Sequence, residues 1–278
     1  MKISKLHGLG NDYVYVNAFD ETVADPAAMA VAVSRPHFGV GADGLVLIGP
    51  SAEADFAMRM FNADGSEGEM CGNAVRCIGK YVHDRGLTRK TEVRLSTLGG
   101  IKTLQLRLKD GSVDQVTVDM GEPAFSPASL PVEWPGERIV NQPLTIDGQT
   151  HHITCVSMGN PHAVIFVDDP KAIDVHGIGR QIENHPLFPR RTNVEFVRVR
   201  RRDLLEMRVW ERGSGETLAC GTGAAASLVA AVLNGLADRS AVVQLTGGEL
   251  QVTWDSSDNH VYQTGPASFV FDGVWLGD

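Results

Sequence analysis

Two stretches of the chain, MCGNAVRCIGKYVHD at residues 70–84 and ACGTGAAASLVAAVL at residues 219–233, constrain the fold most strongly. Each places a Cys-Gly pair directly before a helical pattern, which is expected to run from Asn73 to Asp84 and from Thr222 to Leu233. The second pattern is rich in Ala and Leu and is apolar on most of its faces. Such a helix must be buried, so the rest of the chain has to enclose it.

The two Cys-Gly pairs belong to a repeat whose motifs keep one constant offset, the spacing of Cys71 from Cys220. The other matches at this offset are Asn11 with Asn160 and the tetrapeptide 58–61 with 207–210. Three motifs that keep one offset over about 60 residues indicate duplication of a single structural plan. Each repeat has the size of a domain, so two lobes are expected, with equivalent residues facing each other across a cleft.

Alternating apolar and polar residues predict that most of the remaining chain is β-structure. The clearest strand patterns cover residues 13–16, 163–167 and 206–210. Strands that enclose one buried helix in each half define an α+β protein with two pseudo-symmetric lobes, each a β-rich sheet or barrel wrapped around its helix. The active site is expected in the cleft between the lobes.

Breaks in the periodicity predict where the chain crosses between lobes. The Pro-rich stretch from Met120 to Pro131 is interpreted as the first crossing, and Gly265-Pro266 as the return. The N-terminal lobe, which carries Cys71, is then residues 1–119 with 266–278. The C-terminal lobe, which carries Cys220, is residues 120–265.

Composition excludes several classes of partner. The 278 residues carry a formal net charge of −9, which gives no attraction to nucleic acid or to anionic lipid. The basic cluster Arg198 to Arg202 has acidic neighbours and is interpreted as a solvated strand end. No stretch reaches the roughly 18 apolar residues of a membrane span, and the first residues lack a signal-peptide pattern. A cytoplasmic protein is expected.

The four cysteines, at positions 71, 77, 155 and 220, form no C-x-x-C pair and are expected to be reduced thiols. Cys77 lies six residues beyond Cys71, about 240° around the same helix, and is interpreted as a core residue. Cys155 lies in a strand pattern and has the same interpretation. Cys71 and Cys220 differ from these two core cysteines because each lies at the start of a helix.

The start of a helix presents unpaired N–H groups and the positive end of the helix dipole, which lowers the pKa of a thiol. The same N–H groups, at Gly72-Asn73 and Gly221-Thr222, form a site for a carboxylate. Two such thiols on facing lobes can remove an α-proton from one face of a carbon and deliver another to the opposite face. The sequence therefore predicts a racemase or epimerase in which a thiolate is the base and a thiol is the acid.

Six separated motifs, spread over nearly the whole chain, resemble diaminopimelate epimerases. They are Gly8–Tyr13, Phe61–Ser66, Met70–Asn73, Ser157–His162, Thr192–Phe196 and Glu211–Gly223. The resemblance implies a pyridoxal-independent enzyme of lysine and peptidoglycan-precursor synthesis that interconverts LL- and meso-diaminopimelate. It further implies no cofactor, no metal, a small-molecule substrate and a homodimer.

The resemblance also implies roles for individual residues. Cys71 and Cys220 would be the acid and base, with His162 and Glu211 adjusting their ionisation. The remaining candidates would bind the substrate: Asn11, Asn62, Gly72, Asn73, Asn160, Asn193, Arg212, Gly221 and Thr222. Gly44 departs from relatives that carry a glutamine here, so a substrate contact at this position is uncertain. Glu67, Glu69 and Glu216 are interpreted as complements of the helix dipole.

Two other functions remain open at this point. A proline racemase-like enzyme would keep the fold and change the substrate, which a substrate assay distinguishes. A redox or zinc-binding module would use the cysteines without catalysis, but their spacing does not match that of zinc ligands.

Overall fold

The computed structural model describes residues 1–277 and divides into two compact units. The first contains Met1–Val118 and the segment from Thr264 onward, and the second contains Asp119–Gln263. These limits lie close to the crossings expected at 119/120 and 265/266.

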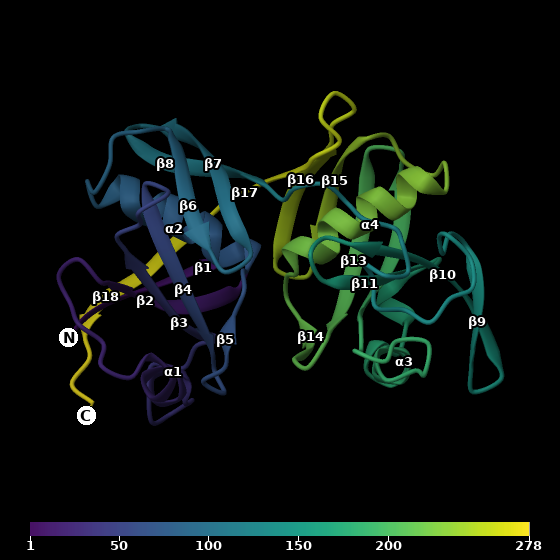
Figure 1. The fold of residues 1–278 in the computed structure, drawn as a ribbon, viewed down its shortest axis with the longest axis horizontal. Helices are drawn as coiled ribbons and strands as arrows, with labels where there is room; N and C mark the ends of the chain where they lie inside the picture. Colours follow the sequence, from purple (N-terminus) through teal and green to yellow (C-terminus); the bar gives the residue numbers. More distant parts are fainter. Residues whose placement is uncertain (278) are drawn as a thin grey trace. The chain divides into compact units, whose positions relative to one another are not determined.

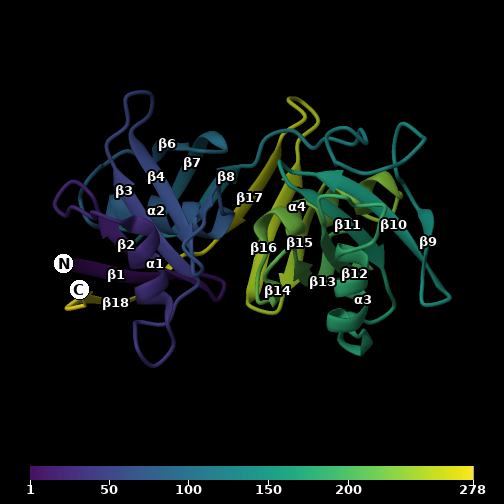
Figure 2. The same ribbon diagram turned by 60° about the horizontal axis from the view of Figure 1, so that its bottom comes forward.

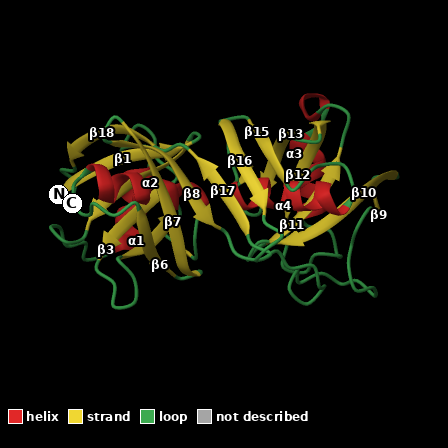
Figure 3. Ribbon diagram, turned by 90° about the horizontal axis from the view of Figure 1, so that it is seen from above, coloured by secondary structure: helices red, strands yellow, loops and turns green. Residues whose placement is uncertain are grey.

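The first unit is a β-sheet that encloses one of its two helices. The helices are α1 (Pro26–Ser34) and α2 (Gly72–Asp84). The strands are β1 (Lys2–Gly8), β2 (Asn11–Asn17), β3 (Gly44–Gly49), β4 (Phe56–Asn62), β5 (Glu67–Gly68), β6 (Glu92–Thr97), β7 (Gly100–Lys109), β8 (Ser112–Asp119) and β18 (Ser268–Val274). Figures 1 and 3 show α2 surrounded by these strands.

The strands of the first unit pair in the order β18-β1-β2-β3-β4-β6-β7-β8. The β2–β3 and β4–β6 pairs are parallel, and the other pairs are antiparallel. Because β1 pairs with β18, the first and last strands of the chain lie side by side. Most residues of α2 are buried, as expected of a helix enclosed by a sheet.

The second unit repeats this plan. Its helices are α3 (Val175–Glu183), α4 (Gly221–Leu233) and the short 3₁₀ helix η1 (Pro170–Ala172). Its strands are β9 (Gln142–Ile146), β10 (Gln149–Ser157), β11 (Pro161–Phe166), β12 (Asn193–Arg201), β13 (Leu204–Glu211), β14 (Gly215–Thr217), β15 (Ser240–Leu245) and β16 (Gly248–Trp254), and β17 (Val261–Gly265) leads back to the first unit. The order is β9-β10-β11-β12-β13-β15-β16, and α4 packs against β10 and β16.

The constant offset found in the sequence is also present in the structure. Helix α3 begins and ends at the same offset from α1 that separates Cys220 from Cys71, and α4 keeps this offset from α2 at both of its ends. The parallel pairs β11–β12 and β13–β15 of the second unit correspond to β2–β3 and β4–β6 of the first. The prediction of an α+β protein with two similar lobes is confirmed.

Two details differ from the sequence prediction. Helices α2 and α4 begin one residue earlier than expected, because the glycine that directly follows each cysteine is already helical. The sequence prediction does not include helices α1 and α3; α1 packs on β3 and α3 on β13 (Figure 2). Both carry a capping aspartate, Asp25 and Asp174, whose side chain accepts a backbone N–H.

The Pro-rich stretch interpreted above as a crossing belongs to the second unit. Ala124 pairs with Ser157 of β10, and Leu130 is 1% exposed in a core that includes Phe196 and Trp210. Prolines end regular structure here without separating the stretch from the core. Within residues 1–277, no helix is long and apolar enough to cross a membrane.

Candidate active site

Cys71 is the residue that precedes the first helical residue of α2. Its backbone is extended, with φ −132° and ψ 120°, and its side chain makes no capping hydrogen bond to the helix. Instead its Sγ donates to Oδ1 of Asn11 on β2 over 3.3 Å. The thiol therefore points toward β2 from the positive end of the helix dipole.

Asn11 connects Cys71 to a polar network within the first unit. Its Oδ1 also accepts from Nδ2 of Asn73 at 3.3 Å, and its own Nδ2 donates to Asp43 at 2.7 Å. Burial raises the pKa of Asp43, while hydrogen bonds from the Asp12 amide and from Asn11 act in the opposite direction. The network brings together three of the candidate site residues, Asn11, Cys71 and Asn73.

Cys220 is the corresponding residue before α4, but it is more deeply buried. Its exposed fraction is 4%, and its Sγ accepts the backbone N–H of Gly223 at 3.4 Å. The hydroxyl of Thr222 lies 3.5 Å from the same sulfur atom. Unlike Cys71, this cysteine caps its own helix.

The prediction that the start of the helix lowers the thiol pKa is wrong for Cys220. Burial raises the pKa of this thiol well above its ordinary value, and the carboxylates of Glu211 and Glu195 raise it further. The Thr222 hydroxyl and the Gly223 amide lower it, but by less. Desolvation outweighs the helix dipole because burial penalises the charged form of the thiol. Cys220 is therefore a protonated thiol at neutral pH.

His162 is placed beside Cys220 by a chain of hydrogen bonds. Its Nδ1 lies 2.6 Å from Oε1 of Glu195, and its Nε2 lies 3.0 Å from Oδ1 of Asn160. Nδ2 of Asn160 donates to the hydroxyl of Thr222 at 3.2 Å. The chain runs from the parallel strands β11 and β12 to the first turn of α4.

Glu211 lies at the end of β13, close to Cys220. Burial raises the pKa of its carboxyl group, while hydrogen bonds from Thr217 and Cys220 and the nearby His162 lower it. Thr217 donates its hydroxyl directly to Oε1 of Glu211. Glu211 therefore lies next to the Cys220 thiol, while His162 is connected to it through Asn160 and Thr222.

Asn193 connects strand β11 to the turn after β13 that carries Arg212. Nδ2 of Asn193 donates to the carbonyl of Pro161 at 2.8 Å, and its Oδ1 accepts the backbone N–H of Arg212 at 2.9 Å. Asn193 therefore holds the turn that carries Arg212. The guanidinium of Arg212 is exposed, and its Nη1 donates to the carbonyl of Arg190 over 3.4 Å. Its N–H fork remains available to a carboxylate.

Two candidates are not brought to either cysteine by the contacts within their unit. Nδ2 of Asn62 donates to Ser66, where it closes the turn between β4 and β5. At Gly44 a Cβ atom would lie 2.0 Å from the carbonyl oxygen of Phe61, so no side chain fits on this backbone. The position where some relatives carry glutamine is closed to side chains here.

Other acids and cysteines have structural roles. Glu67 pairs with Arg59 and Glu216 with Arg208, each at 2.7 Å, so these acids form cross-strand ion pairs instead of complementing the helix dipole. Burial raises the pKa of Cys77 to about 12 and raises that of Cys155 as well. All four cysteines are thiols, and Cys77 and Cys155 lie in the core as predicted.

Three functional neighbours are absent from the sequence prediction. Glu195 lies inside a quoted motif, where one acid in the apolar run from Val194 to Val197 was the available signal. Arg76 is fully buried and donates to Oδ1 of Asn73 at 2.7 Å. Glu183 on α3 accepts the backbone N–H of Gly213 at 2.9 Å and so fixes the turn beside Arg212.

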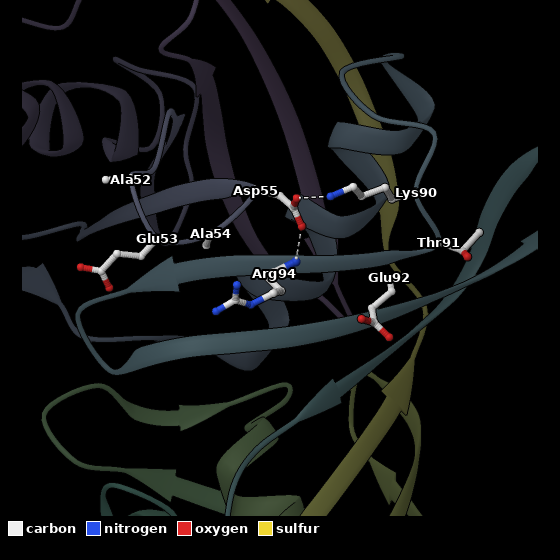
Figure 4. A pocket seen from close by; sticks show the side chains of 8 residues that line it. All are labelled: Ala52, Glu53, Ala54, Asp55, Lys90, Thr91, Glu92 and Arg94. Carbon is white, nitrogen blue, oxygen red and sulfur yellow. Dashed lines mark hydrogen bonds and ion pairs between the residues drawn. The ribbon is translucent and has the colours of Figure 1, made fainter.

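Two surface cavities lie away from the residues around Cys71 and Cys220. One is lined by residues around Asp55, which is hydrogen-bonded by Lys90 and by the backbone of Arg94 (Figure 4). The other lies between η1 and the β15–β16 turn and is lined by Lys171, Arg208 and Glu249. Neither contains a candidate catalytic residue. No cluster of His, Cys, Asp or Glu among residues 1–277 has the arrangement of a metal site.

Solved structures define the class of protein to which this fold belongs. A hydroxyproline epimerase from Agrobacterium vitis aligns with a TM-score of 0.72 and 16% identity, over 98% of this chain and 90% of the other. A phenazine biosynthesis protein from Bacillus anthracis aligns with a TM-score of 0.71 and 16% identity, over 99% of both chains. The chain has the two-lobed fold that these proteins share.

Sequence comparison identifies the family. The model of the diaminopimelate epimerase family matches residues 3–126 and 154–270. The diaminopimelate epimerase of Acetivibrio thermocellus is 58% identical over 273 residues, 98% of each chain, and that of Desulfovibrio desulfuricans is 54% identical over 281 residues, 99% of this chain and 98% of the other. This chain belongs to the diaminopimelate epimerase family of isomerases.

Proposed function

We propose that the protein interconverts LL- and meso-diaminopimelate by proton transfer at one α-carbon, with Cys71 and Cys220 as the two acid/base groups. The observation that carries the proposal is the equivalence of the two thiols. Each precedes a buried helix, and they occupy the same position in the two copies of the structural repeat. One thiolate removes the α-proton, and the opposite thiol delivers a proton to the other face.

The proposal requires the two half-sites to meet around a single substrate molecule. The backbone N–H groups at Gly72-Asn73 and Gly221-Thr222 would hold the carboxylate next to the reacting carbon, where the helix dipoles favour an anion. This contact also stabilises the carbanion-like transition state, because negative charge develops toward that carboxylate. Glu211 and His162 would control the ionisation of Cys220.

The distal end of diaminopimelate is a second amino acid, which needs both hydrogen-bond donors and acceptors. Arg212 would bind its carboxylate through two parallel N–H bonds. The amide side chains supply the remaining donors and acceptors. We assign this role to Asn11, Asn62, Asn160 and Asn193. Gly44 is not assigned a substrate contact.

Incubation of purified protein with LL-diaminopimelate, without added cofactor, tests the proposal. Chiral separation should show the meso form at a rate that is lost in the Cys71→Ala and Cys220→Ala proteins. A parallel incubation with L-proline tests the proline racemase-like alternative and should give no D-proline. If the wild-type protein produced D-proline from L-proline but no meso-diaminopimelate from LL-diaminopimelate, the substrate assignment would be wrong.

We further propose that the enzyme is a cytoplasmic homodimer that needs no cofactor, in line with the roles implied by its motifs. Size-exclusion chromatography with light scattering measures the oligomeric state directly. A monomer that is fully active at nanomolar concentration would contradict the dimer.

A further inference from the structure

Glu195 is a buried acid whose position in the second unit suggests a role in the reaction. Its exposed fraction is 0%, as is that of His162, and Oε1 of Glu195 lies 2.6 Å from Nδ1 of His162. Its other oxygen, Oε2, is buried and has no hydrogen-bond partner among residues 1–277. A carboxylate held in this way needs a cation to balance its charge.

The hydrogen bonds of Asn160 show which atom donates in its contact with His162. Nδ2 of Asn160 donates to Oγ1 of Thr222, so its Oδ1 is turned toward Nε2 of His162. A carbonyl oxygen can only accept, and therefore Nε2 carries a proton. At the other side of the ring, Nδ1 faces Oε1 of Glu195 over 2.6 Å, and an ionised carboxylate can only accept a hydrogen bond from it. With Glu195 ionised, both ring nitrogens donate, and this is the imidazolium form of the ring.

The same directions fix the donor at the sulfur atom of Cys220. Because Oγ1 of Thr222 accepts from Asn160, the hydroxyl proton of Thr222 is available for the sulfur 3.5 Å away. This donor favours the thiolate that forms when Cys220 delivers its proton. From His162 through Asn160 and Thr222 to Cys220 each group thus donates to the next, while the other nitrogen of the His162 ring faces Glu195.

Glu195 also lies against the start of α4. A Cβ atom at Gly223 would lie 2.8 Å from Oε1 of Glu195 and 3.3 Å from Sγ of Cys220. Glycine at this position therefore allows the carboxylate and the catalytic thiol to share the first turn of the helix. Among the described residues, Cys155 on β10 interacts electrostatically with Glu195, and Glu211 on β13 interacts with both His162 and Glu195.

We propose that Glu195 is a positioning residue that keeps His162 as an imidazolium and thereby directs Asn160 and Thr222 to donate toward Cys220. This inference deepens the proposed function, because it concerns the same proton transfer. In the first unit the residue equivalent to Glu195 is Val46, a buried strand residue. A buried carboxylate at this position is therefore found in the half-site of Cys220 and not in that of Cys71.

Long-range ¹H–¹⁵N correlation spectra of the full-length protein, labelled with ¹⁵N-histidine, test the inference without substrate. The His162→Gln variant identifies the signals of this ring. In the wild type at pH 7.5, both nitrogens of His162 should have imidazolium shifts, while in Glu195→Gln one nitrogen should move to the unprotonated range. A neutral His162 in the wild type would overturn the inference, whether or not any variant folds.

Kinetics on the epimerisation reaction provide a second readout. Glu195→Gln should lower kcat by about tenfold or more with KM changed less than about twofold, because Glu195 does not touch the substrate. Glu249→Gln, an exposed change in the same unit, should leave both constants and the His162 signals unaltered. Unchanged kcat in Glu195→Gln would refute the positioning role. Since the spectra need no substrate, a wrong substrate assignment would leave the imidazolium test intact.

Discussion

The Sγ atom of Cys71 lies 3.3 Å from Oδ1 of Asn11, so this thiol donates a hydrogen bond to a neutral acceptor. Cys220 differs, because its sulfur accepts the amide of Gly223 and is close to two carboxylates. The repeat therefore places equivalent cysteines in unlike surroundings. Each cysteine can be probed separately by changing the groups around it.

Replacing Asn11 with Ala should make Cys71 more reactive toward alkylation at neutral pH. The amide oxygen of Asn11 stabilises the protonated thiol, and its loss favours the thiolate. A neutral hydrogen bond of about 1 kcal/mol corresponds to roughly a fivefold faster reaction. Peptide-resolved mass spectrometry after timed iodoacetamide treatment measures the rate at Cys71. Asn62→Ala serves as the matched control, and a slower reaction in Asn11→Ala would contradict the assignment.

Cys71→Ala and Cys220→Ala should each reduce epimerisation by about 10²-fold to 10⁴-fold, the range for loss of a general acid or base. In deuterated water, the wild-type product should carry deuterium at the inverted carbon from the earliest samples, while recovered substrate stays protonated. The reason is that the delivering thiol has exchanged with solvent before turnover. Product that retains the substrate hydrogen would favour a single base and exclude the two-thiol mechanism.

Gly223→Ala should lower activity with little loss of the helix. A Cβ atom here would lie 2.8 Å from Oε1 of Glu195, which forces the carboxylate or the first turn of α4 to move. Alanine is the better helix former, so the helix itself is not expected to unfold. Circular dichroism and the epimerase rate separate the two effects. In Gly49→Ala the added Cβ meets Ala18 at an ordinary 3.6 Å, and normal activity is expected.

Cys77 should make the protein less stable as the pH becomes alkaline. Burial raises its folded-state pKa from 9.0 to about 12, so the folded protein keeps this proton while the unfolded chain loses it. The stabilisation is complete below pH 9 and is lost between pH 9 and about 12, at about 1.4 kcal/mol per pH unit. The free energy of unfolding can be measured by urea denaturation of the wild type and of Cys77→Ala at several pH values in this range. It should fall less steeply with pH in the variant. Equal slopes would contradict the prediction.

Arg212→Lys should reduce kcat/KM by about tenfold or more, equivalent to roughly 1.4 kcal/mol, although the positive charge is kept. Lysine cannot form the two parallel bonds that a guanidinium makes to a carboxylate. Arg201→Lys is a matched control, because Arg201 is an exposed residue of the same unit paired with Asp203. If Arg212→Lys behaves like Arg201→Lys, then Arg212 does not bind the substrate.

The sequence by itself determined the repeat and the two buried helices, to within one residue at the start of each helix. These features follow from local patterns: glycine after cysteine, an apolar helical run, and one constant offset between the motifs of the two halves. The repeat also aligned Asn11 with Asn160, whereas the contact of Asn11 with Cys71 is seen only in the structure. Helices α1 and α3 were predictable from Asp25 and Asp174 as capping residues, but their patterns are short and give a weak signal.

The tertiary structure alone decided the ionisation of the site. The start of a helix lowers a thiol pKa, yet Cys220 has a raised one, because burial and two carboxylates from other strands outweigh the dipole. Strands β13 and β14 separate Glu195 from Cys220 along the chain, and the two residues meet only through the packing of β12 against α4. Desolvation and charge interactions depend on distances in space, which local sequence patterns do not contain.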